Sequence, residues 1–246
     1  MNSNVRMARK NRIQAPGVIH HVMSRGNARM PIFLESADYR QFLHLLGDIV
    51  ESFDIQCWNY CLMPNHYHAT LQPSAPNLSV ALRRLNGRYA QWWNRRHGRV
   101  GHVFQGRFKN QLVQRETYLL ELTRYVVMNP VRAGLVDHPE EWEWSSYRAT
   151  MGLVACPPFV SDGATLSLFG AGDVSALRER LAEFVLRTPL DEGPAERIRS
   201  NERTLGDREF KIRVARSAGT VANGFESTAV PDKDLVAGGL GTGVHA

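Results

Sequence analysis

The sequence predicts an α+β fold in which an antiparallel sheet carries helices on one face. Short β-branched or aromatic runs alternate with longer segments whose apolar residues recur at helical spacing. Two of the short runs are separated only by Pro64-Asn65, a pair that favours a turn between antiparallel strands. The resulting order is β-α-β-β-α-β with one further helix. This is the ferredoxin-like plan, and it leaves the second face of the sheet open.

Four segments have the composition of strands, namely residues 18–23, 55–63, 66–71 and 107–113. The first of them runs into the turn Ser24-Arg25-Gly26-Asn27. Because so few residues join the second and third segments, we expect these two to lie side by side in the sheet.

Three segments between and after these strands have the periodicity of helices. The segment 36–53 has Ser36 as its expected N-cap and Asp38 in its first turn. The segment 116–129 has to end before Pro130, because the residue before a proline avoids the α region. The segment 78–96 is amphipathic, with arginines on its other faces and an apolar stripe formed by Leu78, Leu82, Leu85, Tyr89 and Trp92.

The chain has 246 residues, enough for one well-filled domain and a smaller addition. We expect the first domain to cover residues 1–150, and a helical appendage with helices near 174–187 and 207–215 to cover residues 151–216. Residues 217–246 contain six glycines and one aromatic residue, so we expect a disordered tail there.

No stretch approaches the roughly 18 uninterrupted apolar residues of a membrane span, so we expect no membrane association. The basic start of the chain is followed by no apolar block of the signal-peptide type. Its three cysteines cannot form a disulfide framework. These features together predict a cytoplasmic protein.

The net charge of +6 is distributed unevenly along the chain. Residues 1–150 contain 19 Lys and Arg against 11 Asp and Glu, whereas residues 151–246 contain 11 against 13. No acidic residue occurs from Ile55 to Arg115, a stretch that holds nine basic residues. A solvated basic face is the alternative, but such faces usually mix both signs. The pattern therefore favours binding of nucleic acid.

Two histidines stand two residues apart in the predicted strand 66–71. Side chains at i and i+2 share one face of a strand, so His66 and His68 can approach one cation. A His-x-His pair also fits two surface or partly buried histidines that bind only their neighbours. The pair therefore needs a further ligand before it indicates a metal site.

Tyr125 and Asn129 lie four residues apart in the predicted helix 116–129, so they share one helix face. They would bring a phenol and an amide oxygen to the same region. A tyrosine in an apolar helix also fits plain core packing, since its ring buries much apolar surface. Glu121, one turn before Tyr125, is either a general base or an ion-pair partner of Arg124 or Arg115.

Several separated motifs occur in an order that resembles a known family. They are Arg25-Gly26-Asn27, Met63-Pro64-Asn65-His66-Tyr67-His68, the run from Arg124 through Asn129-Pro130-Val131-Arg132-Ala133-Gly134 to Val136, and Trp144-Ser145-Ser146-Tyr147. Over residues 9–150 the chain resembles the single-tyrosine HUH transposases, particularly the REP-associated tyrosine transposases. Tyr67 stands where the family pattern asks for a bulky apolar residue, which is a small departure.

The resemblance implies a catalytic domain that cuts and rejoins single-stranded DNA at sites flanked by hairpins. It places the nucleophile on Tyr125 and the metal ligands on His66, His68 and Asn129. Mixed nitrogen and oxygen ligation suits Mg²⁺ or Mn²⁺, with Mn²⁺ the better match to imidazole. Attack by the phenol would leave a 5′-phosphotyrosine bond and a free 3′-OH. Such a protein would be associated with the nucleoid.

The charge map and the resemblance together select candidate residues for DNA binding. The turn after the first strand would present Arg25 and Asn27. Arginines of the segment 78–96 and basic residues of the fourth strand would follow phosphates of a hairpin and its single-stranded flank, and the set chosen is Arg83, Arg84, Arg88, Arg95, Arg107 and Lys109. Trp93 lies off the apolar stripe and is a candidate for base stacking, with core packing as the alternative.

Two other functions stay open at this point. One is a DNA-binding protein without catalysis that recognises repeat hairpins, and the other is a metal-dependent nuclease that uses water and keeps Tyr125 for structure. The sequence favours the enzyme, because all four residues of the implied site are present. It favours a monomer, with a homodimer exchanging the tyrosine helix as the alternative.

Overall fold

The computed structural model describes residues 15–187, 197–198, 200 and 202–224. Its centre is a five-stranded sheet in the order β2-β3-β1-β4-β5, formed by β1 (Ile19–Arg25), β2 (Ile55–Met63), β3 (His66–Pro73), β4 (Lys109–Val113) and β5 (Thr204–Leu205). The first four strands are antiparallel to their neighbours, and β5 joins β4 in parallel. The predicted ferredoxin-like α+β fold is confirmed.

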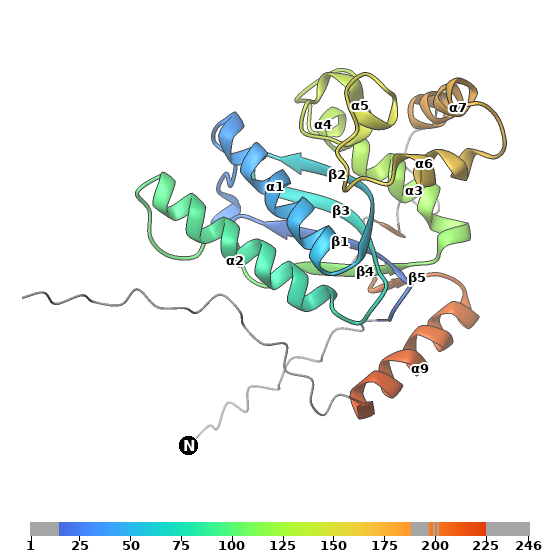
Figure 1. Cartoon of the computed structure of the whole chain (residues 1–246), viewed down its shortest axis with the longest axis horizontal. Helices are drawn as coiled ribbons and strands as arrows, with labels where there is room; N and C mark the ends of the chain where they lie inside the picture. Colours follow the sequence, from blue (N-terminus) through green and yellow to red (C-terminus); the bar gives the residue numbers. More distant parts are fainter. Residues whose placement is uncertain (1–14, 188–196, 199, 201, 225–246) are drawn as a thin grey trace, which may run out of the picture.

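One face of the sheet is covered by α1 (Ser36–Ser52) and α2 (Leu78–Arg96), which lie side by side in Figure 1. Strand residues that face them, such as Val22, Tyr67 and Leu71, form the main core with the apolar stripes of both helices. The stripe of α2 differs from the prediction at its end, because Trp93 is 6% exposed whereas Trp92 is only partly buried. The ring of Trp93 therefore belongs to the core, and the suggestion that it stacks on bases is wrong.

The N-cap of α1 is Glu35 and not Ser36. Asp38 at the third helical position accepts hydrogen bonds from the backbone N–H groups of Leu34 (2.7 Å) and Glu35 (3.2 Å). In return, the Glu35 side chain accepts from the backbone N–H of Asp38. A carboxylate satisfies the free N–H groups of a first turn as well as a serine hydroxyl does. The expected Ser36 cap is thus replaced by a capping box one residue earlier.

The second face of the sheet is not open, because α3 (Arg115–Val127) packs across it. A buried polar network fixes this helix. The Thr70 hydroxyl donates to Asn59 Oδ1 (2.8 Å), and Asn59 Nδ2 donates to the Thr123 hydroxyl (3.1 Å). Because all three side chains are buried, this network specifies how α3 sits on β2 and β3.

The tyrosine helix ends as predicted before Pro130, but a second helical turn follows it directly. α3 stops at Val127, the chain bends at Met128, and α4 (Asn129–Arg132) carries Pro130 in its first turn. A proline is tolerated there because the first N–H groups of a helix have no partner within the helix. The bend keeps Asn129 close to the end of α3.

The Trp144-Ser145-Ser146-Tyr147 motif runs along the outer edge of β2. The backbone N–H of Leu62 donates to Trp144 O (2.9 Å), and that of Ser146 donates to Tyr60 O (3.1 Å). The Trp144 ring stacks on Tyr39 of α1 at 4.4 Å between centroids. The motif thus covers an edge strand that would otherwise be free to pair.

Described residues after 150 contact the first part of the chain near both ends of the sheet. α6 (Asp162–Leu166) contacts β2, and α7 (Val174–Arg187) packs on the end of α3 through a cluster around Val127. At the other end of the sheet, α9 (Arg208–Gly224) packs Phe210 and Val214 against Leu112 of β4. The short elements are η1 (Asn27–Arg29), η2 (Pro139–Glu141), α5 (Tyr147–Thr150) and η3 (Ser167–Phe169).

The boundary predicted at residue 150 stays a prediction. The appendage helix predicted at 174–187 is α7, and the one near 207–215 is longer, since α9 continues through Gly224. Residues 217–224 are therefore helical, which differs from the disorder expected there, and residues 225–246 lie outside the described part. None of the helices in the described part is both long and apolar enough to cross a membrane.

Candidate active site

The two histidines of the His-x-His pair lie on the face of the sheet that α3 covers. Their ring centroids are 5.0 Å apart, and His68 is buried whereas His66 is half-buried. β1 places a third histidine beside them, because His68 pairs with Met23 and His21 stands two residues away on the same face. His21 Nε2 lies 2.9 Å from His68 Nδ1.

α3 brings Tyr125 onto this histidine cluster within the same chain. The centroid of its ring is 5.7 Å from that of His68 and 5.6 Å from that of His21, and both contacts are edge-on. The side chain is partly buried. Within the described residues, the Tyr125 hydroxyl has no hydrogen-bond partner. The structure thus brings together the phenol and the histidine pair that the sequence singled out.

Asn129 is held against the end of α3 by its own amide. Its Nδ2 donates to the backbone oxygens of Tyr125 (2.7 Å) and Val126 (3.3 Å). With the NH₂ group so used, Oδ1 is turned away from these helix carbonyls and keeps its lone pairs for another partner. The amide oxygen is therefore not used by these two hydrogen bonds.

A cation that the sequence analysis did not select completes the surroundings of Tyr125. The guanidinium of Arg132 lies over the Tyr125 ring, 4.5 Å from its centroid, and donates to Tyr125 O. Residues 125 and 132 are seven apart, but the helix predicted from the sequence ends before Pro130, so their spacing does not predict this contact. Arg132 belongs to the motif from Arg124 to Val136, but the sequence alone indicates no role for it.

The hydrogen bonds of His66 determine which of its ring nitrogens carries the proton. Asn65 Nδ2 donates to Arg29 O (3.0 Å), so Asn65 Oδ1 is the atom that faces His66 Nδ1, at 2.6 Å. An amide oxygen only accepts, so Nδ1 of His66 is the donor. The lone pair of its Nε2 is then available to a metal.

Burial keeps the histidines of the site neutral. It lowers the pKa of His66 to about 4, with a further contribution from the Arg25 charge. It also holds the pKa of His68 well below its ordinary value, and nearby His21, His66, Arg132 and Arg25 add to the effect. Because a metal needs the unprotonated nitrogen, these rings are ready to coordinate one near neutral pH.

The donor set of this site fits a divalent cation: two neutral imidazoles and one amide oxygen. A different group, Glu35, Asp38 and His97, also places its ligand atoms within 4.8 Å of one another. It lies on the opposite side of the sheet, and its atoms are already used. Asp38 accepts from the backbone N–H groups of Leu34 and Glu35 and contacts His97 Nε2 (2.9 Å). Glu35 pairs with Arg96 (2.7 Å). That group is a helix cap joined to α2.

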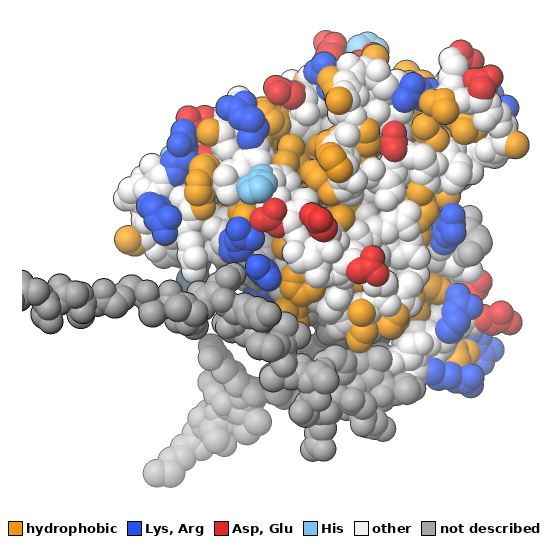
Figure 2. Space-filling model, in the orientation of Figure 1, with side chains coloured by type: hydrophobic (Ala, Val, Ile, Leu, Met, Phe, Trp, Pro, Cys, Tyr) orange, Lys and Arg blue, Asp and Glu red, His pale blue; other side chains and the backbone are white. Residues whose placement is uncertain are grey.

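Residues chosen for DNA binding fall into two groups. In the first group, Arg25 stands opposite His66 in the register of β1 and β3, and Lys109 is exposed on the histidine face of β4. Asn27 is exposed at the start of η1, and Arg107 is exposed just before β4. The second group, exposed on α2 in the layer on the far side of the sheet, consists of Arg83, Arg84, Arg88 and Arg95. Figure 2 shows Lys and Arg side chains gathered over α2 with a few acidic ones beside them.

The turn that carries Arg25-Gly26-Asn27 is built around a close backbone approach. A Cβ atom on Gly26 would come within 2.0 Å of Met30 O, so only glycine fits there. The loop is tied to the turn before β3, since Gly26 N–H donates to Asn65 O (2.8 Å) and Ile32 N–H to Pro64 O (2.8 Å). This motif therefore positions Asn65, and through it His66.

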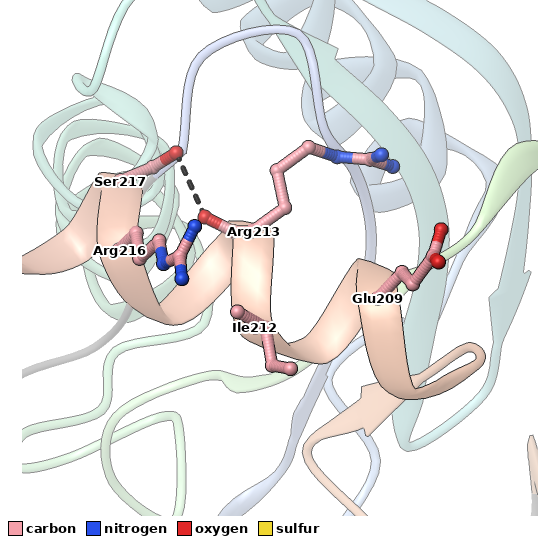
Figure 3. Close-up of a pocket in the computed structure, with 5 residues that line it drawn as sticks. All are labelled: Glu209, Ile212, Arg213, Arg216 and Ser217. Atoms are coloured by element: carbon pink, nitrogen blue, oxygen red, sulfur yellow. Dashed lines mark hydrogen bonds between the residues drawn. The ribbon is translucent and has the colours of Figure 1, made fainter.

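Glu121 forms an ion pair with Arg124 at 3.1 Å, and the guanidinium of Arg124 also lies 3.7 Å from the centre of the Phe184 ring of α7. Of the two roles considered for Glu121, the ion-pair partner is the one observed. A hollow along α9 is lined by Glu209, Ile212, Arg213, Arg216 and Ser217, whose side chains spread along one helix without converging (Figure 3). α9 packs against Leu112, which points away from the histidine face.

The fold brings a histidine cluster and a tyrosine together on one face of a ferredoxin-like sheet. Residues 15–129 match the family described as "Transposase IS200 like". That segment contains His66, His68, Tyr125 and Asn129, and the match confirms the resemblance seen in the motifs.

One solved structure is similar over much of the chain, that of a REP-associated tyrosine transposase bound to a REP hairpin. The two share 18% sequence identity with a TM-score of 0.51, and the match covers 68% of this chain and 93% of the other. At this identity the likeness establishes the fold. A comparison with curated proteins gives no match.

Proposed function

We propose that this protein is a metal-dependent transposase that nicks and rejoins single-stranded DNA at hairpin sites through a 5′-phosphotyrosine intermediate. The observation that carries the proposal is the contact of the Tyr125 ring with His68, at 5.7 Å between centroids, on the face where His66 and His68 lie together. Both belong to one chain, and no hydrogen bond within the described residues holds the phenol in another role.

The chemistry follows from this arrangement. The Tyr125 oxygen attacks the phosphorus of the scissile phosphate and loses its proton, the bond from phosphorus to O3′ breaks, and the leaving oxygen takes up a proton to become a 3′-OH. A divalent metal, held by His66, His68 and Asn129, would supply positive charge to the non-bridging oxygens. A later 3′-OH reverses the step and releases the tyrosine, so no external energy source is required.

Two residues beside Tyr125, Arg132 and Asn129, would assist its attack. A free phenol has a pKa of about 10 and is a weak nucleophile at neutral pH. The Arg132 guanidinium, 4.5 Å from the centre of the Tyr125 ring, supplies positive charge close to the reacting tyrosine, where it would stabilise the negative charge that develops in the transition state. Asn129, which bonds to the backbone of Tyr125, connects the nucleophile to the metal site.

For the substrate we propose a hairpin with a single-stranded flank. The flank would enter the site beside Arg25, Asn27, Arg107 and Lys109, and the α2 arginines would follow phosphates of the paired stem. The similar transposase is itself bound to a REP hairpin, which supports this substrate class.

We propose that the active site is completed within a monomer. The end of α3 is fixed to its own chain by the cluster around Val127 and by Arg124 on the Phe184 ring of α7. A homodimer that exchanges α3 would have to break these contacts. Light scattering of the full chain, alone and with DNA, distinguishes the two arrangements.

The test of function is a covalent adduct. The protein is incubated with a labelled hairpin oligonucleotide and Mn²⁺, and the products are separated on a denaturing gel. We expect a protein–DNA band that disappears in Tyr125→Phe, while that variant still shifts the DNA on a native gel. A shift without cleavage would indicate a binding protein, and cleaved product without an adduct would indicate a nuclease that uses water.

A further inference from the structure

A chain of hydrogen bonds runs from the segment after α7 through the sheet to His68. Gln111 Nε2 on β4 donates to the backbone oxygens of Ser200 (3.1 Å) and Glu202 (2.9 Å). Gln111 Oε1 lies 3.0 Å from His21 Nδ1, and His21 Nε2 lies 2.9 Å from His68 Nδ1. Three neighbouring strands thus contribute one side chain each.

The direction of every bond in this chain follows from its first link. The two carbonyls can only accept, so they take both protons of the Gln111 amide and leave its oxygen facing His21. In a neutral imidazole one nitrogen donates and the other accepts. His21 must therefore donate from Nδ1 and accept at Nε2, and His68 must donate from Nδ1. The lone pair of His68 then lies on Nε2.

We propose that Gln111 and His21 are positioning residues that fix His68 as the Nδ1-protonated tautomer and so present its Nε2 to the metal. The proposal rests on the proposed function in one respect, the role of His68 as a ligand. It adds that the orientation is determined by backbone carbonyls at residues 200 and 202, beyond the segment that matches the transposase family.

The segment that supplies these carbonyls is itself anchored. Glu202 pairs with Arg197 (2.9 Å) and Lys211 (2.8 Å), and the backbone N–H of Leu112 donates to Arg203 O (2.8 Å). β5 follows directly and pairs with β4. This part of the chain therefore serves the site through Gln111 without touching the histidines.

The two ligands are oriented independently. His66, the first residue of β3, is oriented by Asn65, which is itself held by Arg29 O. His68 is oriented from the β4 side of the sheet, through Gln111 and His21. In each case an amide side chain, held by a backbone carbonyl, orients an imidazole. Outer partners of this kind typically change metal affinity by about 10–100-fold when removed.

Two substitutions at position 21 separate orientation from packing. His21→Gln keeps an acceptor at the distance of Nε2 but removes the ring that packs on Tyr125, whereas His21→Phe keeps a ring and removes the acceptor. If His21 orients His68, the Phe variant loses Mn²⁺ affinity by about 10–100-fold and the Gln variant by no more than about threefold. If His21 only fills space, the Gln variant loses more Mn²⁺ affinity than the Phe variant, and that result would overturn the proposal.

A measurement without metal tests the tautomer directly. Long-range ¹⁵N NMR of histidine-labelled full-length protein reports which nitrogen of His68 carries its proton. We expect the Nδ1-protonated form in the wild type and in His21→Gln, and loss of that single form in His21→Phe and Gln111→Met. His68 protonated at Nε2 in the folded wild type would refute the proposal.

The two readouts also separate this inference from the proposed function. If the wild type shows the expected tautomer but forms no DNA adduct, the proposed transposase activity is refuted and the orientation of His68 by Gln111 and His21 stands. If the wild type forms the adduct, but Gln111→Met changes neither the His68 tautomer nor the Mn²⁺ affinity, the transposase activity stands and the orientation of His68 by Gln111 is refuted. Urea unfolding of each variant confirms that the comparison is made on folded protein.

Discussion

The guanidinium of Arg132 lies 4.5 Å from the centre of the Tyr125 ring and also donates to the backbone oxygen of Tyr125. One cation thus contacts both the aromatic ring and the backbone of the proposed nucleophile. Its charge also contributes to the low pKa of His68, so it acts on both halves of the site. A cation in this position opposes a protonated His68 and can stabilise negative charge that develops during attack by the tyrosine.

We predict that Arg132→Gln slows formation of the DNA adduct by about tenfold to a hundredfold, because charge stabilisation at a reacting oxygen is worth a few kcal/mol. Arg132→Lys should recover part of the rate, since it keeps the charge but loses the planar stacking on the ring. Single-turnover cleavage of a labelled hairpin measures both variants. Equal rates for Gln and wild type, with unchanged DNA affinity, would remove Arg132 from the mechanism.

A second prediction concerns the polar network that seats α3. Thr123→Val keeps the shape of the side chain but leaves the buried Asn59 Nδ2 without its acceptor. An unsatisfied buried donor costs about 1–3 kcal/mol, and we expect the free energy of unfolding in urea to fall by that amount. Because Tyr125 lies two residues further along α3, adduct formation should also slow.

The control for this substitution is Ser167→Ala, which removes an exposed hydroxyl that donates to the backbone oxygen of Ala164 in the preceding helix α6. It should leave both stability and cleavage close to wild type. If Thr123→Val is equally neutral, the network is not what holds α3 on the sheet.

Much of the fold follows from local pattern. β2 and α2 begin and end at the predicted residues, because a short apolar and aromatic run and a long apolar stripe are strong signals. The error at Trp92 and Trp93 arises at the last turn of α2, where either of two adjacent residues can reach the core. β5 has only two residues and no local signal, so its pairing with β4 could not be foreseen.

The site divides in the same way. Spacing along one strand singled out His66 and His68, spacing along one predicted helix singled out Tyr125 and Asn129, and the resemblance to the family gave their expected roles. His21 and Gln111 were missed, since their nearness to His68 depends on the register of three strands, which the sequence does not state. Arg132 was visible in a motif but needed the bend at Met128 to bring it over Tyr125.

A third prediction concerns acid. His20 lies on the face opposite the site, its Nδ1 is 3.0 Å from Asn110 Oδ1, and burial lowers its pKa to about 4. The unfolded chain, in which histidine titrates at about 6.5, binds a proton more readily than the folded chain does. Stability from this group is therefore present above pH 6.5 and is lost as the pH falls towards 4.

We expect the free energy of unfolding to decline between about pH 6.5 and 4, with His20 alone contributing on the order of 3 kcal/mol to the change. His20→Gln removes the titrating group but keeps an amide that can bond to Asn110, so its curve should be flatter over this range. Urea denaturation at a series of pH values measures the slopes. Parallel curves for the two proteins would show that His20 is not responsible.

The last prediction separates the basic residues on the two sides of the sheet. Arg84 is exposed on α2 and has no carboxylate partner among the described residues, whereas Arg88 on the same helix pairs with Asp48 at 3.0 Å. If α2 follows the stem of the hairpin, Arg84→Gln should weaken DNA binding several-fold and reduce the slope of log Kd against log salt by about 0.7–0.9. Arg88→Gln should do less, because part of its charge is already compensated within the protein.

Lys109→Gln, on the histidine side, tests the other group with the same assay. It should weaken binding of a hairpin that carries a single-stranded flank more than binding of the blunt hairpin, because the flank is the part that reaches the site. Arg84→Gln should affect both DNAs equally. If Lys109→Gln weakens binding of both DNAs and Arg84→Gln weakens binding of neither, α2 does not contact the DNA, and the hairpin binds on the histidine side of the sheet.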